Sequence, residues 1–456
     1  MSVLGTPGRP LRVAIVGSGP SGFYTAECLL KQNLNIKVDM FDRLPAPFGL
    51  VRYGVAPDHL KIKNVTKVFE KTAGNPKFSF LGNVTVGKNI SVFELNKFYD
   101  AVVFAYGAES DRHLGINGED LAGSYTATEF VAWYNGHPDF QDHHFDLSKD
   151  LAIIVGNGNV AMDVARILCK TPEELKSTDI TQNALDALAE SKIKEVYMYG
   201  RRGPVQAAFT APEIREMGEL ADCYPVIDPQ DLQLNESSLK ELEAPGNAGR
   251  KKNYEIMQSF LSIDPCGRKR KFVLHFARSP VEIIGKGLVQ KVKFEINKLE
   301  GEPNKQKVRG TGRFEEIDCG IFFRSVGYTG IPIKGLPFSV QTGVVPNHLG
   351  RVIDSDKVFT GCYVAGWIKR GATGIIGTNK PDAEETVKSL LEDIERLKPC
   401  EIPSSEELIK FLKDREVRVV TFEDWKKIDT AEVERGAKLG KPREKFSKVT
   451  DMLSAI

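Results

Sequence analysis

No two cysteines of this 456-residue chain are close enough to form a C-x-x-C pair. Their spacing excludes a dithiol active centre, an iron–sulfur cluster held by a local cysteine run, and a zinc knuckle, so no metal site is expected. An odd number of scattered thiols is typical of a reducing compartment, which predicts a cytoplasmic protein. The seven cysteines are Cys28, Cys169, Cys223, Cys266, Cys319, Cys362 and Cys400.

Long apolar runs and an excess of one charge are also missing. No stretch approaches about 18 consecutive apolar residues, so no transmembrane helix is expected. The chain has 62 Lys and Arg against 61 Asp and Glu, a formal net charge of +1, which gives no support for bulk binding to nucleic acid or a membrane surface. Residues 1–10 are polar and rich in Gly and Pro, and we expect a frayed terminus there rather than a targeting peptide.

The first motif is a glycine-rich turn between a strand and a helix. A β-branched run, Leu11–Val16, leads into G-x-G-x-x-G at residues 17–22, a helix is predicted over residues 23–32, and a second strand over residues 36–41 ends at Asp42. Gly17 permits the tight turn, Gly19 lets a pyrophosphate approach the backbone, and Gly22 lets the helix pack against the strand. A carboxylate at the end of the second strand accepts hydrogen bonds from ribose hydroxyls, so this unit predicts a dinucleotide site.

A second unit of the same kind starts at Leu151. The strand ends in G-x-G-x-x-A at Gly156, Gly158 and Ala161, and the next strand ends at Gly200 with Arg201 and Arg202. Guanidinium groups at this point favour the 2′-phosphate of NADP(H), where a carboxylate would favour a bare ribose. The alternative is that the two arginines belong to a solvated turn. Two units of different character predict two nucleotides, FAD in the first and NADP(H) in the second.

The order of these units predicts how the domains are arranged. Strands near residues 99–108 and 321–328 are expected to leave and re-enter the first domain. We predict an α/β fold of two Rossmann-like, three-layer dinucleotide-binding domains, in which the NADP-binding domain is inserted in the FAD-binding domain. The predicted parts are residues 1–108 (FAD-binding, first part), 109–328 (NADP-binding) and 329–456 (FAD-binding, second part, with a tail that caps it).

Five longer motifs carry a family resemblance over nearly the whole chain. The sequence resembles the adrenodoxin reductase family of ferredoxin–NADP⁺ reductases, including its bacterial members. The resemblance implies a glutathione-reductase-like fold and a reaction in which NADPH reduces FAD, which passes single electrons to a ferredoxin-type iron–sulfur protein. The motifs are VGSGPSGFYTA near the start, PFGLVRYGVAPDH at 47–59, GNGNVAMDVARIL at 156–168, GRRGPVQAAFT at 200–210 and AGWIKRGATGIIGTNK at 365–380.

The resemblance implies which residues hold the two cofactors. Asp42 stands where relatives usually have Glu, and Trp367 is a narrow marker of the family. Gly374 is also expected near the nicotinamide, and Arg112 matches a basic position of bacterial relatives. The positions that match FAD contacts are Ser21, Asp42, Leu50, Val86, Trp367, Gly374, Ile375 and Ile376. Those that match NADP contacts are Gly158, Asn159, Val160, Ala161, Arg201, Arg202 and Glu213.

By the same resemblance, His59 and Glu216 match a pair near the contact of nicotinamide and flavin. Hydride transfer needs no general acid, but reduced flavin exchanges a proton with solvent, and this pair is predicted to relay or tune that proton. The alternatives are that His59 is a structural histidine after a Pro-Asp turn and that Glu216 is an acid on a helix surface.

A basic docking face is expected because ferredoxins are usually acidic. Two clusters inside the inserted domain are the candidates, although a charge run is often only a solvated face. One comprises Arg250, Lys251 and Lys252, near the family's basic ferredoxin-binding segment, and the other Arg268, Lys269, Arg270 and Lys271. Two competing functions remain: a FAD/NADPH-dependent monooxygenase or small-molecule reductase on the same scaffold, and a non-enzymatic nucleotide-binding subunit of a larger complex.

Overall fold

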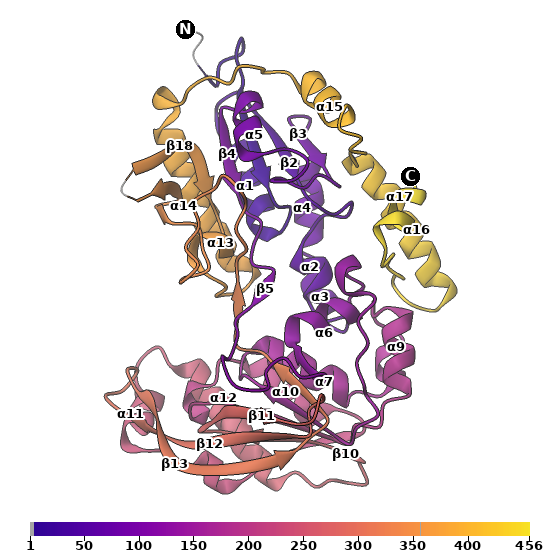
Figure 1. Ribbon diagram of the computed structural model, residues 1–456, viewed down its shortest axis with the longest axis vertical. Helices are drawn as coiled ribbons and strands as arrows, with labels where there is room; N and C mark the ends of the chain where they lie inside the picture. The colour runs from indigo at the N-terminus through magenta and orange to yellow at the C-terminus, as the bar shows by residue number, and fades with distance from the viewer. Residues whose placement is uncertain (1–3, 356) are drawn as a thin grey trace.

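The first sheet is built from both ends of the chain. The computed structural model describes residues 4–355 and 357–456, and its largest sheet has the order β16-β17-β18-β4-β1-β2-β3 (Figure 1). Its neighbours are parallel from β18 to β3, whereas β16, β17 and β18 are antiparallel. The strands are β1 (Leu11–Val16), β2 (Ile36–Phe41), β3 (Phe78–Leu81), β4 (Ala101–Phe104), β16 (Asn347–His348), β17 (Arg351–Asp354) and β18 (Lys357–Val364).

The second sheet is wholly parallel, with the order β6-β14-β7-β8-β10-β9. A separate antiparallel sheet packs on one face of the parallel sheet, and the two sheets share a hydrophobic cluster. Its strands are β11 (Arg278–Ile284), β12 (Lys291–Glu300) and β13 (Lys307–Asp318). The strands of the parallel sheet are β6 (Ser124–Thr126), β7 (Leu151–Val155), β8 (Glu195–Tyr199), β9 (Cys223–Ile227), β10 (Arg270–His275) and β14 (Ile321–Arg324).

Each large sheet is buried on both faces, as parallel sheets require. In β1, Val13 and Ile15 belong to one hydrophobic cluster while Ala14 belongs to another, since successive side chains alternate between faces. In β7, Ile154 and Ile153 divide between two clusters in the same way. This three-layer construction confirms the predicted α/β fold with one dinucleotide-binding domain inserted in the other.

Helices form the layers around the sheets. Those of the first domain are α1 (Pro20–Leu30), α2 (Leu50–Tyr53), α3 (Leu60–Lys63), α4 (Thr66–Ala73), α5 (Val92–Phe98), α13 (Trp367–Arg370), α14 (Asn379–Glu392), α15 (Ser405–Lys413), α16 (Phe422–Lys438) and α17 (Val449–Ser454). Those of the second domain are α6 (Ala127–Tyr134), α7 (Asn159–Cys169), α8 (Pro172–Leu175), α9 (Gln182–Ala189), α10 (Ala211–Glu219), α11 (Glu236–Glu243) and α12 (Ala248–Ser259). None of the described helices has the length and apolar character needed to cross a membrane.

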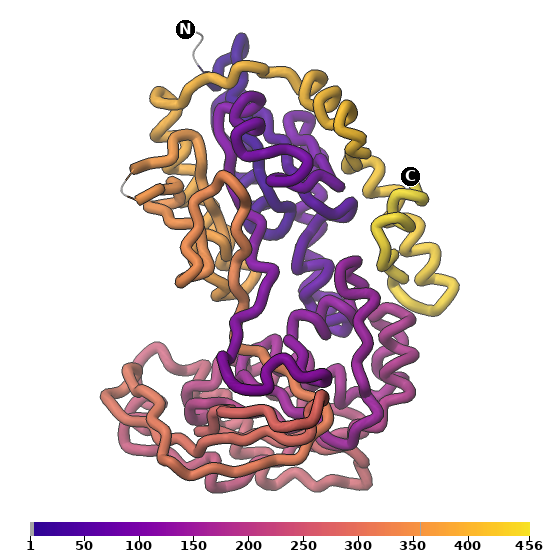
Figure 2. The backbone as a smooth tube through the Cα atoms, viewed as in Figure 1, coloured from indigo at the N-terminus to yellow at the C-terminus, as the bar shows by residue number. Residues whose placement is uncertain are grey.

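The chain passes between the domains twice, and the two crossings pair with each other. β5 (Ser110–Asp111) leads into the second domain, β15 (Tyr328–Thr329) leads out of it, and they form a two-stranded antiparallel ribbon. Figure 2 shows both segments running through the gap between the two bodies. The crossings lie beside residues 108 and 328, and the domain boundaries themselves stay a prediction.

Candidate active site

The first nucleotide loop joins β1 to α1 and leaves space where a phosphate would lie. Gly17 has φ +109°, and a Cβ there would overlap the backbone of Ala105 and Tyr106. A Cβ on Gly22 would overlap the carbonyl oxygen of Gly17, whereas no atom lies within 4 Å of a Cβ on Gly19. The residues present therefore fit a pyrophosphate at the N-terminus of α1.

Asp42 and Ser21 are both held by the protein itself. The Asp42 carboxylate accepts hydrogen bonds from the backbone N–H of Ser18 (3.1 Å) and of Leu44 (2.9 Å), and from the Ser18 hydroxyl. Burial raises the pKa of Asp42 despite these bonds. Ser21 donates from its hydroxyl to Oδ1 of Asn379 at the start of α14 (2.9 Å). These contacts fix the rim of the loop before any ligand arrives.

The predicted flavin-end residues gather around α13 and the turn after it. The Trp367 ring lies 5.3 Å from the ring of Tyr328 in the linker ribbon, and its Nε1 donates to the carbonyl oxygen of Thr373 (3.1 Å). Gly374 has φ +83°. Ile375 is 65% exposed, which is unusual for a large apolar side chain and is consistent with a surface that a ligand covers. Ile376 is half-buried.

The remaining predicted flavin positions differ in exposure. Leu50, at the first position of α2, is exposed, whereas Val86 is buried. Arg112 follows β5, where its N–H donates to the carbonyl oxygen of Gly327 (3.0 Å) and its side chain is exposed beside the linker ribbon.

The second nucleotide loop joins β7 to α7 and is more open than the first. Gly156 has φ +133°, and a Cβ there would overlap the carbonyl oxygen of Ser325. Nothing lies within 4 Å of a Cβ on Gly158. Asn159 accepts a hydrogen bond from the Thr210 N–H (2.8 Å), Val160 is half-buried, and Ala161 is buried.

Arg201 and Arg202 follow the end of β8, and both are exposed. Partial burial and the neighbouring charges of Arg201 and Arg250 lower the pKa of Arg202 although Glu241 opposes them, so positive charge is crowded around Arg202. Crowded cations of this kind favour a phosphate, and the local chemistry fits the 2′-phosphate of NADP(H).

His59 and Glu216 meet across the two domains. His59 immediately precedes α3 in the first domain, Glu216 lies on α10 in the second, and Nε2 of the histidine is 3.1 Å from Oε2 of the glutamate. Burial lowers the pKa of His59 and the hydrogen bond to Glu216 raises it, with a net rise; the same bond lowers the pKa of Glu216. The pair is therefore able to hold a proton between the domains.

Arg166 is a site residue that the sequence analysis missed. Its side chain is fully buried, and its guanidinium donates to both carboxylate oxygens of Asp58 (2.8 and 3.0 Å), to Asp163 (2.6 Å) and to Glu213 (2.9 Å). Asp58 belongs to the first domain and the other three residues to the second. Two charged residues, Asp163 and Arg166, inside the otherwise apolar sequence of α7 were the signal that could have revealed this cluster.

Glu213 was predicted to contact NADP, and the structure places its carboxylate beside Arg166 and 3.9 Å from Nδ1 of His59. Burial and the negative charge of Asp163 raise the pKa of Glu213 to about 7. The ligand atoms around His59 are close enough to hold a metal ion. The Arg166 guanidinium already contacts these carboxylates, and we expect it to take the place of a metal cation.

Both basic clusters contain paired as well as exposed charges. Lys251 and Lys252 on α12 are exposed, and Lys252 lies 3.4 Å from Glu255. In the second cluster, Arg270 donates to carbonyl oxygens at the end of α7, and Lys271 pairs with Glu195 (2.9 Å). Arg250 of the first cluster pairs with Glu241 (3.2 Å), so each cluster combines paired charges with exposed lysines, and the choice between them as a docking face stays a prediction.

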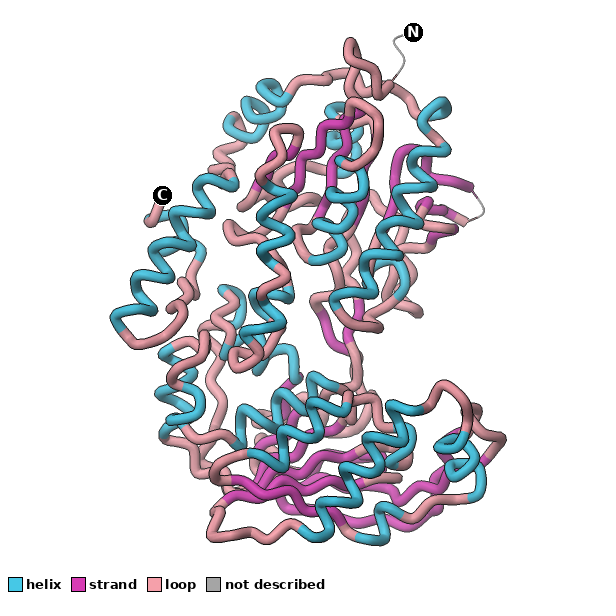
Figure 3. The backbone as a smooth tube through the Cα atoms, turned by 180° about the vertical axis from the view of Figure 1, so that it is seen from behind, coloured by secondary structure: helices cyan, strands magenta, loops and turns pink. Residues whose placement is uncertain are grey.

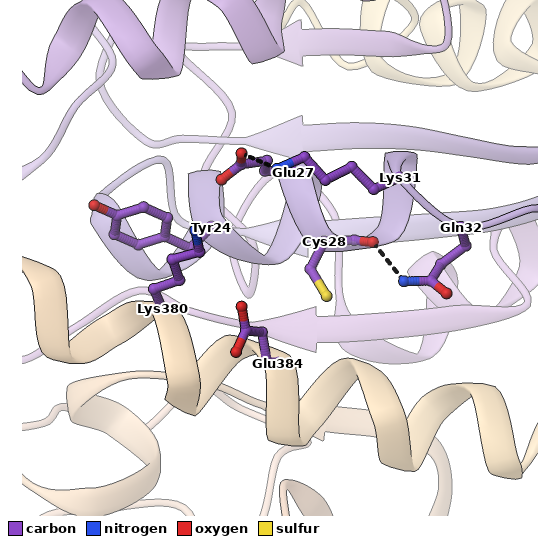
Figure 4. A pocket seen from close by; sticks show the side chains of 7 residues that line it. All are labelled: Tyr24, Glu27, Cys28, Lys31, Gln32, Lys380 and Glu384. Atoms are coloured by element: carbon purple, nitrogen blue, oxygen red, sulfur yellow. Dashed lines mark hydrogen bonds and ion pairs between the residues drawn. The ribbon is translucent and has the colours of Figure 1, made fainter.

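A shallow pocket between α1 and α14 carries no chemistry of its own (Figure 4). Burial raises the pKa of its one thiol, Cys28, which disfavours the reactive thiolate. The pocket is lined by Tyr24, Glu27, Cys28, Lys31, Gln32, Lys380 and Glu384.

Comparison with known proteins agrees with this geometry. Residues 11–200 match the model of the family described as pyridine nucleotide-disulphide oxidoreductase. The chain is 45% identical to NADPH:adrenodoxin oxidoreductase, mitochondrial, of Arabidopsis thaliana, over 98% of this chain and 95% of that one. It is 44% identical to NADPH-ferredoxin reductase FprA of Mycobacterium tuberculosis, over 98% and 99%. The structure of that FprA in complex with NADPH superposes with a TM-score of 0.92 at 43% identity, covering 98% of this chain and 99% of the other.

Proposed function

Since this chain belongs to the family of NADPH:adrenodoxin oxidoreductases and NADPH-ferredoxin reductases, we propose that it moves electrons from NADPH through FAD to a ferredoxin-type iron–sulfur protein. The observation that carries the proposal is the presence of two unlike nucleotide loops in one chain, one ending in Asp42 and the other in Arg201 and Arg202. All seven cysteines are free thiols, and none has a partner at C-x-x-C spacing, so a thiol relay has no support.

Each loop has a separate task in this reaction. FAD, when bound, accepts the two electrons of a hydride and releases them one at a time. The first loop and Asp42 would hold its phosphates and ribose, and the turn at Gly374–Ile376 would hold its ring end. The second loop binds the NADPH pyrophosphate, while Arg201 and Arg202 hold the 2′-phosphate. These ligand roles rest on the open cradles at Gly19 and Gly158 and on the charges beside them.

His59 and Glu216 hold a proton where the domains meet. Four carboxylates, from Asp58, Asp163, Glu213 and Glu216, face two basic side chains, Arg166 and Lys170. Burial and the charge of Asp163 raise the pKa of Glu213, and, although burial opposes it, the hydrogen bond to Glu216 raises that of His59, so a proton on each reduces the excess negative charge. The cluster can thus hold protons, and since the resemblance puts His59 and Glu216 near the contact of nicotinamide and flavin, we assign it the proton exchange with solvent.

A ferredoxin panel tests the function. Purified protein with NADPH and cytochrome c is expected to reduce the cytochrome only when a ferredoxin is added. A monooxygenase or small-molecule reductase would instead consume NADPH in step with an organic substrate, with oxygen in the first case, and without ferredoxin. NADPH turnover that no ferredoxin stimulates would contradict the proposal. A cytoplasmic location remains part of the proposal and is supported by the seven free thiols.

A further inference from the structure

The chain between α16 and α17, residues 439–448, is the C-terminal arm. α16 is anchored in the first domain, because Phe422, Trp425 and Ile428 lie in its core with Met452 of α17. Figures 1 and 3 show α16 descending along the flank of the first domain, so that the arm reaches α9 of the second domain, on the other side of the molecule from the linker ribbon. Both ends of the arm are therefore fixed to one domain while its turn faces the other.

Three side chains of the arm bind the start of α9. Lys441 Nζ donates to the carbonyl oxygen of Ile180 (2.9 Å), and Glu444 accepts from the N–H of Gln182 (3.0 Å). Lys445 Nζ donates to the carbonyl oxygen of Asp179 (3.0 Å). All three side chains are buried. Glu444 therefore accepts from an N–H that a helix start leaves without an intrahelical partner, and the two lysines donate to carbonyl oxygens just before the helix.

A buried charge cluster joins the arm, the second domain and the catalytic segment. The Asp179 carboxylate pairs with Lys445 (3.2 Å) and with Lys63 of α3 (2.7 Å). Burial lowers the pKa of both lysines, that of Lys445 to about 7. Lys63 ends the same short helix that His59 precedes. The position of Asp179 is therefore tied to the position of the histidine that meets Glu216.

The arm is held on its own side by Glu432 of α16. This fully buried carboxylate pairs with Arg52 of α2 (2.5 Å) and accepts a hydrogen bond from the N–H of Phe446 (2.9 Å). The main-chain carbonyl oxygen of Glu432 accepts a hydrogen bond from the N–H of Glu444 (2.9 Å). The arm is thus fixed to the first domain. Because Glu432 also pairs with Arg52 of α2, a displacement of the arm would displace the α2–α3 segment as well.

From this arrangement we propose that the C-terminal arm is a latch that holds the second domain in the orientation in which its nicotinamide site faces the flavin site. Besides the linker, the domains meet at the Arg166–Asp58 and His59–Glu216 contacts, and interfaces within a chain allow motion unless they are large and hydrophobic. The latch contacts the second domain on the side away from that linker. Its buried ion pairs are suited to fixing the orientation of the domain rather than to adding stability. This role rests on the proposed function and extends it, because Lys445 is a positioning residue that contacts neither nucleotide site.

The direct test measures the relative position of the domains, and it does not depend on the reaction. Spin labels are placed on Cys266, which is exposed in the second domain, and on a cysteine introduced at exposed Lys37 in the first, with Cys28→Ser as background. We expect one narrow distance distribution for the parent protein and a broad or shifted one for Lys445→Met. Lys448→Met is the matched control, because Lys448 is an exposed lysine of the same arm, and it should leave the distribution unchanged.

The kinetic consequence separates positioning from binding. Misplaced reacting atoms cost up to about 100-fold in rate, so Lys445→Met should slow flavin reduction by saturating NADPH at least tenfold while flavin content and NADP⁺ affinity stay near those of the parent. If Lys445→Met does not retain flavin, Lys441→Met removes another latch contact, the one to the carbonyl oxygen of Ile180, at similar size and answers the same question. An unchanged distance distribution in the folded variants would overturn the latch; a parent protein that NADPH does not reduce would overturn the proposed function instead.

Discussion

The two nucleotide loops of this protein share a glycine pattern and differ in almost everything around it. At the first loop, Ser18 is buried, its carbonyl oxygen accepts the Phe48 N–H (3.0 Å), and its hydroxyl is bonded to Asp42. At the second loop, Arg201 and Arg202 are exposed. The glycines define where a dinucleotide binds, and the surrounding residues decide whether it stays. A closed, acidic site suits resident FAD, and an open, basic site suits NADPH that must exchange.

The largest expected effect comes from adding a Cβ at a glycine of the first loop that has no space for it. Gly22→Ala places a Cβ on the carbonyl oxygen of Gly17, and since no rotamer relieves that overlap, we expect a loss of more than about 3 kcal/mol of stability and a protein that purifies without flavin. Gly158→Ala, at an open position that corresponds to Gly19 of the first loop, should keep its flavin absorbance and bind NADPH more weakly. Full flavin content in Gly22→Ala would contradict the steric role of Gly22 in the first loop.

The next effect tests the charge difference between the loops. Arg201→Ala and Arg202→Ala each remove a charged hydrogen-bond donor worth about 1.5–3 kcal/mol, which corresponds to a rise of about 10- to 150-fold in KM for NADPH. KM for NADH should stay almost constant, because NADH lacks the 2′-phosphate. Arg313→Ala, at an exposed arginine of β13, is the control. If neither KM changes, the arginines belong to a solvated turn; equal losses for the two nucleotides would contradict recognition of the 2′-phosphate.

A pH comparison probes the cluster where the two nucleotide-binding domains meet. The pKa of Glu213 is about 7 in the folded protein and 4.5 in an unperturbed glutamate, so the folded state holds more protons than the unfolded state between these values. Its contribution to stability is therefore complete below pH 4.5 and is lost as the pH rises through 7. Glu213→Gln removes this loss, so its Tm relative to the parent should be higher at pH 8 than at pH 5. A relative Tm that does not change with pH would contradict the protonated glutamate.

The smallest expected effect concerns the docking surface beside the open loop. Lys251→Ala and Lys252→Ala should each raise KM for ferredoxin only a few-fold, since exposed charges contribute about 0–1 kcal/mol each, and should weaken the salt dependence of the electron-transfer rate. Lys269→Ala, at an exposed lysine of the second cluster, is the comparison variant and should change neither; an effect there would move the docking face to the second cluster. If the rate is independent of ionic strength in the parent protein, neither cluster is an electrostatic docking face.

The sequence predicted the local motifs well, because each loop is encoded by neighbouring residues. The strand at Leu11–Val16, the strand ending at Asp42 and the double crossing of the linker follow from periodicity and glycine spacing. The charge cluster around Arg166 could not be found in this way, since Asp58 and Glu213 lie far apart in sequence and meet only when the domains pack. The tail was expected to cap the flavin domain, and only the structure reveals its contacts with α9.

His59 and Glu216 also show which features the sequence predicts and which only the structure reveals. The family resemblance predicted a role for both residues. The structure adds that they belong to different domains and that His59 Nε2 lies 3.1 Å from Glu216 Oε2. Their contact therefore depends on domain orientation, which sequence patterns do not encode. His59→Ala is expected to slow flavin reduction by NADPH, and identical stopped-flow traces for variant and parent would remove the pair from the proton path.

Anaerobic flavin reduction after gel filtration tests the central claim most directly, because it asks at once which nucleotide stays and which exchanges. The protein should leave the column yellow, with FAD retained, and added NADPH should bleach the flavin absorbance at least about tenfold faster than NADH, the factor that 1.4 kcal/mol of 2′-phosphate recognition supplies. Oxidised ferredoxin should then restore the colour. A colourless protein, or equal rates with NADPH and NADH, would contradict the assignment of the two loops.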